Sequence, residues 1–173
     1  MASYYYLISS LPTLKADAPM PFSYDEFLAM CANAVSKDVF RRLSELTLYS
    51  DEGPLLKQWG TFYNNLMNSL NKQRAQQLGK PFNGSADKDD FTDKAVDSAM
   101  SAKNPLEAER ILLSCQFDYL DSLVAMHNFD DYVLFGYAVK LKLLERQSVF
   151  DKAAGKEEFE KLSEGIEKLI LNI

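Results

Sequence analysis

The segment NPLEAERILLSCQFDYLDSLV, residues 104–124, carries the clearest helix signal in the chain. Asn104 has the short polar side chain that caps a helix N-terminus, Pro105 suits the first helical position, and Glu107 stands where a capping-box acid is expected. Apolar residues then recur three and four positions apart, which places them on one helix face. That face comprises Leu106, Leu113, Phe117, Leu120 and Val124, widened by Leu112, Cys115, Tyr119 and Leu123. The segment therefore predicts a core helix.

Similar signals on both sides of this segment predict further helices. Ser23 and Glu26 have the spacing of a capping box, and Ser36 is a second candidate N-cap. Caps, apolar spacing and breakers predict helices at residues 24–34, 36–46, 55–78, 91–100, 132–150 and 156–171. The apolar face of the last of these comprises Phe159, Leu162, Ile166, Leu169 and Ile170. Together the segments predict an all-α fold, a multi-helix bundle of six to seven helices.

The N-terminal stretch YYYLISSL, positions 4–11, carries a different signal. Aromatic and β-branched side chains are typical of extended segments, and Pro12 with two later prolines disfavours helix as far as residue 22. We therefore expect residues 1–22 to form a short extended N-terminal arm with a Pro-rich connector. Residues 23–173 are expected to form a single helical domain.

The three tyrosines of this stretch, Tyr4, Tyr5 and Tyr6, have two interpretations. Each combines an apolar ring with a hydroxyl, so they suit burial on the bundle or contact with a partner protein. A signal peptide is disfavoured, because no Lys or Arg precedes the apolar run and Ser9 and Ser10 interrupt it. Burial on the bundle is the simpler interpretation, and a partner interface is the alternative.

Composition excludes several classes of protein. The chain has 19 basic and 25 acidic residues and a formal charge of −6, which disfavours nucleic acid as a partner. No apolar run approaches the roughly 20 residues of a membrane span, so direct insertion into a membrane is not expected. Cys31 and Cys115 lie far apart within apolar helical patterns, and we expect buried free thiols in a cytoplasmic protein.

The sequence contains no recognisable catalytic or cofactor-binding motif. One histidine and two distant cysteines are too few for a typical zinc or iron site, and neither a glycine-rich phosphate loop nor a GxSxG motif occurs. Four acids, Asp118, Asp121, Asp130 and Asp131, lie near His127 in sequence. They could bind a hard cation, but acids at a helix N-terminus explain them more simply. We expect no catalytic residue, metal or cofactor, although a hydrolase using His127 remains the enzymatic alternative.

The predicted helix at residues 55–78 is unusual because it contains no acid in an acidic chain. Lys57, Lys72 and Arg74 lie on it, and Lys80 follows it. A solvated helix face is the simpler interpretation. The alternative is an interface for an acidic protein surface, because complementary charges assist docking.

Four stretches together carry a resemblance to a known family. They are YYYLISSLPTL at residues 4–14, SYDEFLAMC at 23–31, NPLEAERIL at 104–112 and YAVKLKLLERQSVFD at 137–151. The chain resembles a small bacterial family of unknown function that is encoded beside the subunits of V-type (A/V-type) ATPases. That family is similar to the C subunit of these ATPases, which is named d in eukaryotes.

The resemblance implies a structural role without catalysis. The C subunit is an all-helical adaptor on the cytoplasmic face of the membrane rotor ring, where it receives the central stalk. By this resemblance the chain would be a cytoplasmic, non-catalytic subunit whose partners are the central stalk and rotor ring. It is much shorter than a three-domain C subunit, so it would be a reduced form, a homologue of part of one, or a fragment. The alternative is a free-standing helical module that binds a protein or peptide in an apolar groove.

Overall fold

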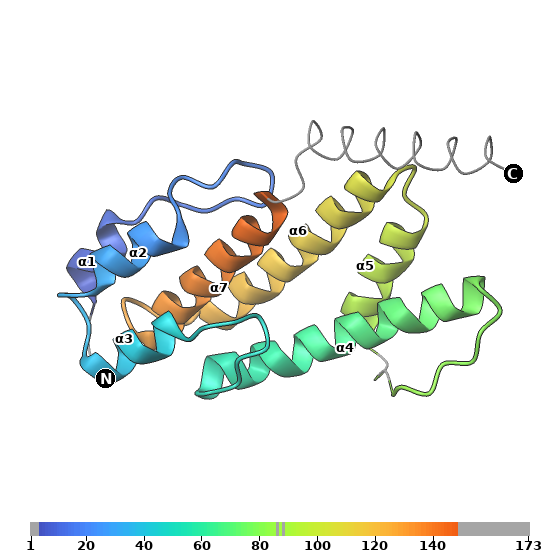
Figure 1. The fold of residues 1–173 in the computed structure, drawn as a ribbon, viewed down its shortest axis with the longest axis horizontal. Coiled ribbons are helices and arrows are strands. Elements are labelled where there is room, and N and C mark those ends of the chain that lie inside the picture. The colour runs from blue at the N-terminus through green and yellow to red at the C-terminus, as the bar shows by residue number, and fades with distance from the viewer. Residues whose placement is uncertain (1–3, 86, 88, 149–173) are drawn as a thin grey trace, which may run out of the picture.

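The computed structural model describes residues 4–85, 87 and 89–148, and this part of the chain is all-helical with no strand (Figure 1). The all-α prediction is therefore confirmed. The described helices are α1 Tyr5–Ser10, α2 Tyr24–Cys31, α3 Lys37–Ser44, α4 Pro54–Gln77, α5 Asp90–Met100, α6 Pro105–Val124 and α7 Asp131–Ser148. The helix expected at residues 156–171 lies outside the described residues.

Local capping explains where several helices begin. At α2 the Ser23 hydroxyl accepts a hydrogen bond from the backbone N–H of Glu26, and the Glu26 carboxylate accepts one from the backbone N–H of Ser23. At α6 the Asn104 side chain accepts a hydrogen bond from the backbone N–H of Glu107 over 2.9 Å. Each cap satisfies donors that the first turn of a helix leaves unpaired. The predicted capping box and the predicted Asn104 cap are confirmed.

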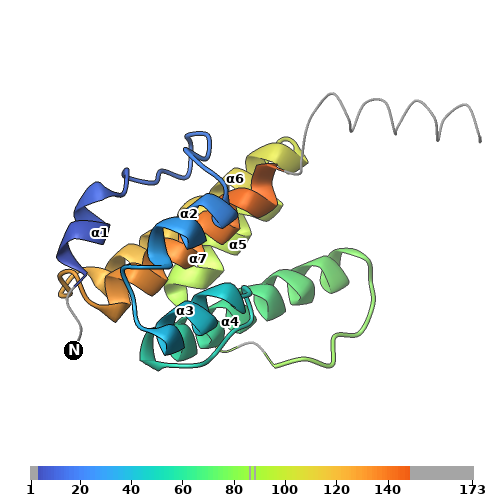
Figure 2. The ribbon, with the colours of Figure 1, turned by 60° about the vertical axis from the view of Figure 1, so that its left-hand side comes forward.

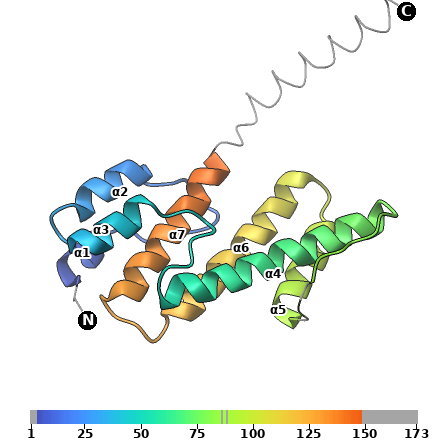
Figure 3. The ribbon, with the colours of Figure 1, turned by 60° about the horizontal axis from the view of Figure 1, so that its bottom comes forward.

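The helices pack around the pair α6 and α7, which lie side by side (Figure 1). Helix α5 covers one side of α6, α4 crosses beneath α5, α6 and α7, and α2 packs on α7 with α3 beside it (Figures 1 and 3). One continuous apolar core runs through these contacts. Its fully buried residues include Phe27, Trp59, Leu66, Leu120 and Leu134. The chain thus buries side chains from all along the described sequence in one core.

Polar groups inside the bundle tie α4 to its neighbours. The Trp59 indole N–H donates to the backbone oxygen of Leu48 over 3.0 Å, and its ring stacks on Tyr63. The Tyr63 hydroxyl accepts a hydrogen bond from Arg146 of α7, and Arg146 also pairs with Glu109 of α6 over 3.2 Å. These hydrogen bonds give partners to the polar atoms of the two buried rings, which limits the free-energy cost of burying them. They join α4, α6 and α7 at one end of the bundle.

The N-terminal segment differs from the extended arm that the sequence predicted. Residues Tyr5–Ser10 form a short helix, while residues 12–22 are non-helical, as the prolines predicted. Tyr4 and Leu7 are buried, and Ile8 and Leu11 are partly buried against the same core. This spacing of three, four and seven positions is the helical pattern. The aromatic and β-branched residues suggested an extended segment, but β-propensity depends strongly on tertiary context, and here packing decided the conformation.

Both cysteines are free and buried, as expected. Burial raises the pKa of each thiol, Cys31 and Cys115, to about 11, because the thiolate would lose its hydration. For Cys115 the nearby Asp118 and Asp89 carboxylates act in the same direction. A thiol with such a pKa is almost entirely protonated at neutral pH and therefore a weak nucleophile.

Candidate interaction surfaces

The acid-free helix is the first candidate surface. Helix α4 contains no Asp or Glu, and none occurs between residues 53 and 86. Lys57, Lys72 and Arg74 are all exposed or partly exposed. Lys57 lies in the first turn of α4, however, and a rise of 1.5 Å per residue puts it roughly 22 Å from Lys72 along the helix. Lys72 and Arg74 therefore lie at the same end of the helix, on different sides of it because they are two positions apart, while Lys57 lies apart from them.

The C-terminal end of α4 contributes nothing to the core. No residue from 71 to 80 is buried, and Leu78 is 69% exposed. The Gln73 side chain contacts α5, because its amide donates a hydrogen bond to the carboxylate of Asp97. Figures 2 and 3 show this end of α4 pointing away from α7. With Lys72, Arg74 and Lys80 it forms a projecting basic surface, which we call the α4 tip (residues 71–80).

The N-terminal tyrosines separate into one core residue and two surface residues. Tyr4 is buried, and burial together with the neighbouring Asp131 carboxylate raises its pKa to about 12. Tyr5 is 53% exposed and Tyr6 is 88% exposed. The Tyr5 ring lies 4.7 Å from that of Phe129 in the α6–α7 loop. The structure thus supports burial for Tyr4 and leaves Tyr5 and Tyr6 available to a partner, at the opposite end of the molecule from the α4 tip (Figure 1).

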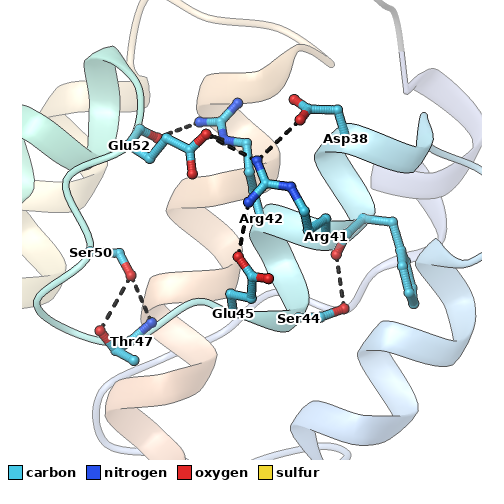
Figure 4. Close-up of polar contacts among 9 residues, drawn as sticks. Asp38, Arg41, Arg42, Ser44, Glu45, Thr47, Ser50 and Glu52 are labelled. Carbon is cyan, nitrogen blue, oxygen red and sulfur yellow. Dashed lines mark hydrogen bonds and ion pairs between the residues drawn. The ribbon is translucent and has the colours of Figure 1, made fainter.

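A network of charged side chains links α3 to the loop that leads to α4 (Figure 4). Arg41 pairs with three carboxylates, Asp38 at 3.2 Å, Glu45 at 2.9 Å and Glu52 at 3.2 Å. Arg42 donates a hydrogen bond to the backbone oxygen of Glu52 and stacks over Phe135 of α7. Since the Arg41 pairs are exposed, each contributes little to stability. Arg42 is the residue that links this connection to the core.

A small cavity of about 160 Å³ lies beside Arg42. Its wall is apolar where Leu55, Leu56 and Phe135 line it, and it also contains Arg42 and Asp131. Arg42 Nε and Asp131 Oδ1 are buried and have no hydrogen-bond partner among the described residues. Because the cavity presents both signs of charge, an anion or a cation would meet repulsion from one of them. The cavity is therefore a poor site for a charged ligand.

A larger, open groove of about 710 Å³ runs between α5 and α6. Its apolar floor comes from Phe91 and Ala95 of α5 and from Ile111 and Cys115 of α6. Phe91 is 43% exposed, although burying a phenylalanine side chain would stabilise the protein. The sequence predicted both helices but gave no indication of the groove. It depends on how far apart the two helices pack, which no local pattern encodes.

His127 lies in the turn between α6 and α7, where its imidazole contacts an acid and a tyrosine. His127 Nδ1 lies 2.6 Å from Asp130 Oδ2, and the imidazole stacks on Tyr132 at 3.8 Å. No nucleophilic side chain is bonded to the imidazole among the described contacts. Within the described residues no three His, Cys, Asp or Glu side chains lie close enough together to hold a metal ion. The expectation that no enzyme site exists stays a prediction.

Comparisons with protein-family models, with curated proteins and with solved structures found no match to this chain. None of the helices described here is long and apolar enough to cross a bilayer. Function is therefore inferred from the surfaces themselves and from the resemblance of the sequence.

Proposed function

We propose that this chain is a non-catalytic helical adaptor that binds another protein through the α4 tip. The observation that carries the proposal is that residues 71–80 are basic, free of acids and unburied, while the chain as a whole carries a charge of −6. Two helical turns without core contacts gain little from the bundle, because helix stability in proteins comes mainly from packing. A partner with an acidic surface would supply both the packing and the complementary charge.

The partner we propose is a bacterial V-type ATPase, with this chain placed like the C subunit between the central stalk and the rotor ring on the cytoplasmic side. The four resembling stretches support this assignment. The all-helical bundle is compatible with it, because a part that transmits torque needs stiff helices and matched surfaces rather than a reactive site. Tyr5 and Tyr6 would offer a second contact at the far end of the molecule.

Charge reversal at the α4 tip tests the docking surface. The variant Lys72→Glu/Arg74→Glu is expected to weaken binding to the purified ATPase complex several-fold to about tenfold at low salt, with a smaller effect at high salt. Lys57→Glu, distant on the same helix, should have little effect. The matched control is Lys15→Glu/Lys37→Glu, which makes the same charge change at exposed positions elsewhere. Equal binding by both double variants would contradict the assignment of the α4 tip.

Co-purification tests the identity of the partner. The tagged chain, recovered from its native cells under conditions that keep the ATPase intact, is expected to bring central-stalk or rotor-ring subunits with it. Recovery of the chain without any part of the ATPase would contradict the ATPase proposal. Binding of another protein that still depends on Lys72 and Arg74 would retain the adaptor role and change only the partner.

A free-standing module that binds a peptide is the second candidate function. The α5–α6 groove favours it, because an apolar floor flanked by charged side chains suits an amphipathic helix. This candidate predicts that changes in the groove abolish partner binding while changes at the α4 tip do not. Adding a groove variant such as Ile111→Asp to the same binding experiments therefore separates the two functions.

A further inference from the structure

The α5–α6 groove leaves apolar surface uncovered in the part of the chain that the structure describes. Phe91, Ala95 and Ile111 are all partly or substantially exposed along it. On α6 the groove extends from Glu107 to Asp118, which is about 17 Å of helix. An occupant would need apolar residues along one helix face over about that length.

The C-terminal sequence of this chain meets that requirement. Phe159, Leu162, Ile166 and Ile170 recur at the spacing of one helix face, and Phe159 to Ile170 spans about 17 Å if helical. The number of residue positions from Phe159 to Ile170 is the same as that from Glu107 to Asp118 on α6. The two lengths therefore match along the whole groove.

The end of α7 lies close to one end of the groove. Arg146, two residues before the end of α7, pairs with Glu109 in the first turns of α6 over 3.2 Å. Figure 1 shows α7 ending on the side of the molecule where α6 begins. Residues 149–155 can span roughly 23 Å when extended, which is enough to pass the N-terminus of α6. The chain would then enter the groove at Glu107 and run parallel to α6.

The charges agree with this direction. The entry end of the groove carries one acid and one base, Glu107 and Arg110, and Glu157, Glu158 and Glu160 would enter there. At the far end, the groove carries Asp90 and Asp118, and the approaching part of the C-terminal sequence carries Lys168. The opposite direction would bring the three glutamates to the two aspartates. Because the far end is the more acidic of the two, less repulsion favours the parallel arrangement.

We propose that residues 156–171 bind in the α5–α6 groove of the same chain, parallel to α6, with Ile166 opposite Ser114 and Cys115. The groove is then part of the core of the full chain and is closed to a peptide from another protein. This inference does not depend on the ATPase proposal.

Disulfide trapping in the full-length chain tests the arrangement. Ser114 is exposed and lines the groove, so Ser114→Cys is a conservative change there. In a Cys115→Ser background, Ser114→Cys with Ile166→Cys is expected to form a disulfide within one chain under mild oxidation. Ser114→Cys with Glu164→Cys, on the other face of the segment, should form it at least about tenfold more slowly. The second control, Ser122→Cys with Ile166→Cys, places the thiol on α6 beyond the groove.

Two outcomes would overturn the proposal. A disulfide that forms only between two chains would assign the groove to a second copy. Equal trapping of the Ile166 and Glu164 pairs would show that the segment has no fixed place in the groove.

A second measurement does not depend on disulfide geometry. The double change Leu162→Asp/Ile166→Asp is expected to raise the rate at which a soluble maleimide labels Ser114→Cys by about tenfold, because it removes the apolar contacts that cover the groove. Labelling of Ser122→Cys should stay unchanged. An unchanged rate at Ser114→Cys would contradict the proposal.

Discussion

At the scale of single residues, Asp130 holds the turn between α6 and α7 with both of its carboxylate oxygens. Oδ1 accepts hydrogen bonds from the backbone N–H groups of Tyr132 at 3.1 Å and Val133 at 3.3 Å, while Oδ2 pairs with His127. Burial opposes ionisation, but these donors outweigh it and lower the pKa of Asp130. The acid therefore serves as the N-cap of α7, the role that the simpler interpretation of the sequence gave to acids in this region.

Replacing Asp130 should destabilise the protein in a pH-dependent way. Asp130→Ala is expected to lower the free energy of unfolding by about 1 kcal/mol at neutral pH, and Asp130→Asn by less, because the amide oxygen can still accept from the backbone. Since the folded pKa is lowered, the contribution of the charge is present above an unfolded pKa of about 4 and is lost as the pH falls through the folded value.

Urea denaturation at neutral pH and near pH 3 measures this effect. The difference between the wild type and Asp130→Asn should shrink at the acidic pH. A difference of the same size at both pH values would contradict the role of the charge, and an unaffected Asp130→Ala would contradict the cap.

At the scale of secondary-structure elements, two glycines inside helices have opposite surroundings. A Cβ added at Gly136 of α7 would lie 2.8 Å from Val124 Cγ1 of α6, closer than side-chain atoms normally approach. A Cβ added at Gly60 of α4 would have its nearest neighbour, the backbone oxygen of Ser50, at 3.9 Å. Gly136 is therefore needed for the close packing of α6 and α7, whereas Gly60 is not needed for space.

Alanine substitution at these two positions should change stability in opposite directions. Gly136→Ala is expected to lower the free energy of unfolding by about 1–3 kcal/mol, because the added methyl group overpacks the contact between α6 and α7. Gly60→Ala is expected to be neutral or to raise it by up to about 1 kcal/mol, because alanine favours the helix. Chemical denaturation of the two variants measures both effects. A loss at Gly60 as large as that at Gly136 would contradict the role of close packing.

At the scale of the whole molecule, protonated tyrosines contribute to the single core. Burial raises the pKa of Tyr4 and Tyr137 to about 12, with the Asp131 carboxylate adding to the effect at Tyr4. Burial also raises the pKa of Tyr24, whose hydroxyl donates to the backbone oxygen of Leu43 over 2.8 Å. The Tyr137 hydroxyl donates to the backbone oxygen of Pro12 and so ties the N-terminal connector to α7. The folded state therefore holds these protons more tightly than the unfolded chain.

The protein should consequently lose stability at alkaline pH. Because the folded pKa values are raised, the contribution is complete below an unfolded tyrosine pKa of about 10 and is lost as the pH rises through about 12. We expect Tm to fall across this range, and to fall less in Tyr4→Phe/Tyr137→Phe, which has fewer buried hydroxyls to ionise. Thermal unfolding followed by circular dichroism at several pH values measures this. The same decline in the double variant would assign the alkaline loss to other groups.

The sequence by itself determined most helix starts, because the signals that set them are local. A cap such as Ser23 or Asn104 acts within one turn, and an apolar period of 3.6 residues repeats within the helix that it describes. The sequence also indicated an acid-free α4, since charge is a property of composition.

Only the tertiary structure decided which surfaces of these helices are buried and which are exposed. Tyr4 is anchored by its backbone N–H, which donates to the backbone oxygen of Phe129 over 2.7 Å, and this contact joins residues 125 positions apart. Two further features likewise follow from where distant segments pack or stop packing: the α5–α6 groove and the exposed α4 tip. Helix hydrogen bonds close between neighbours in the chain, whereas burial depends on parts of the chain that meet only in the folded protein.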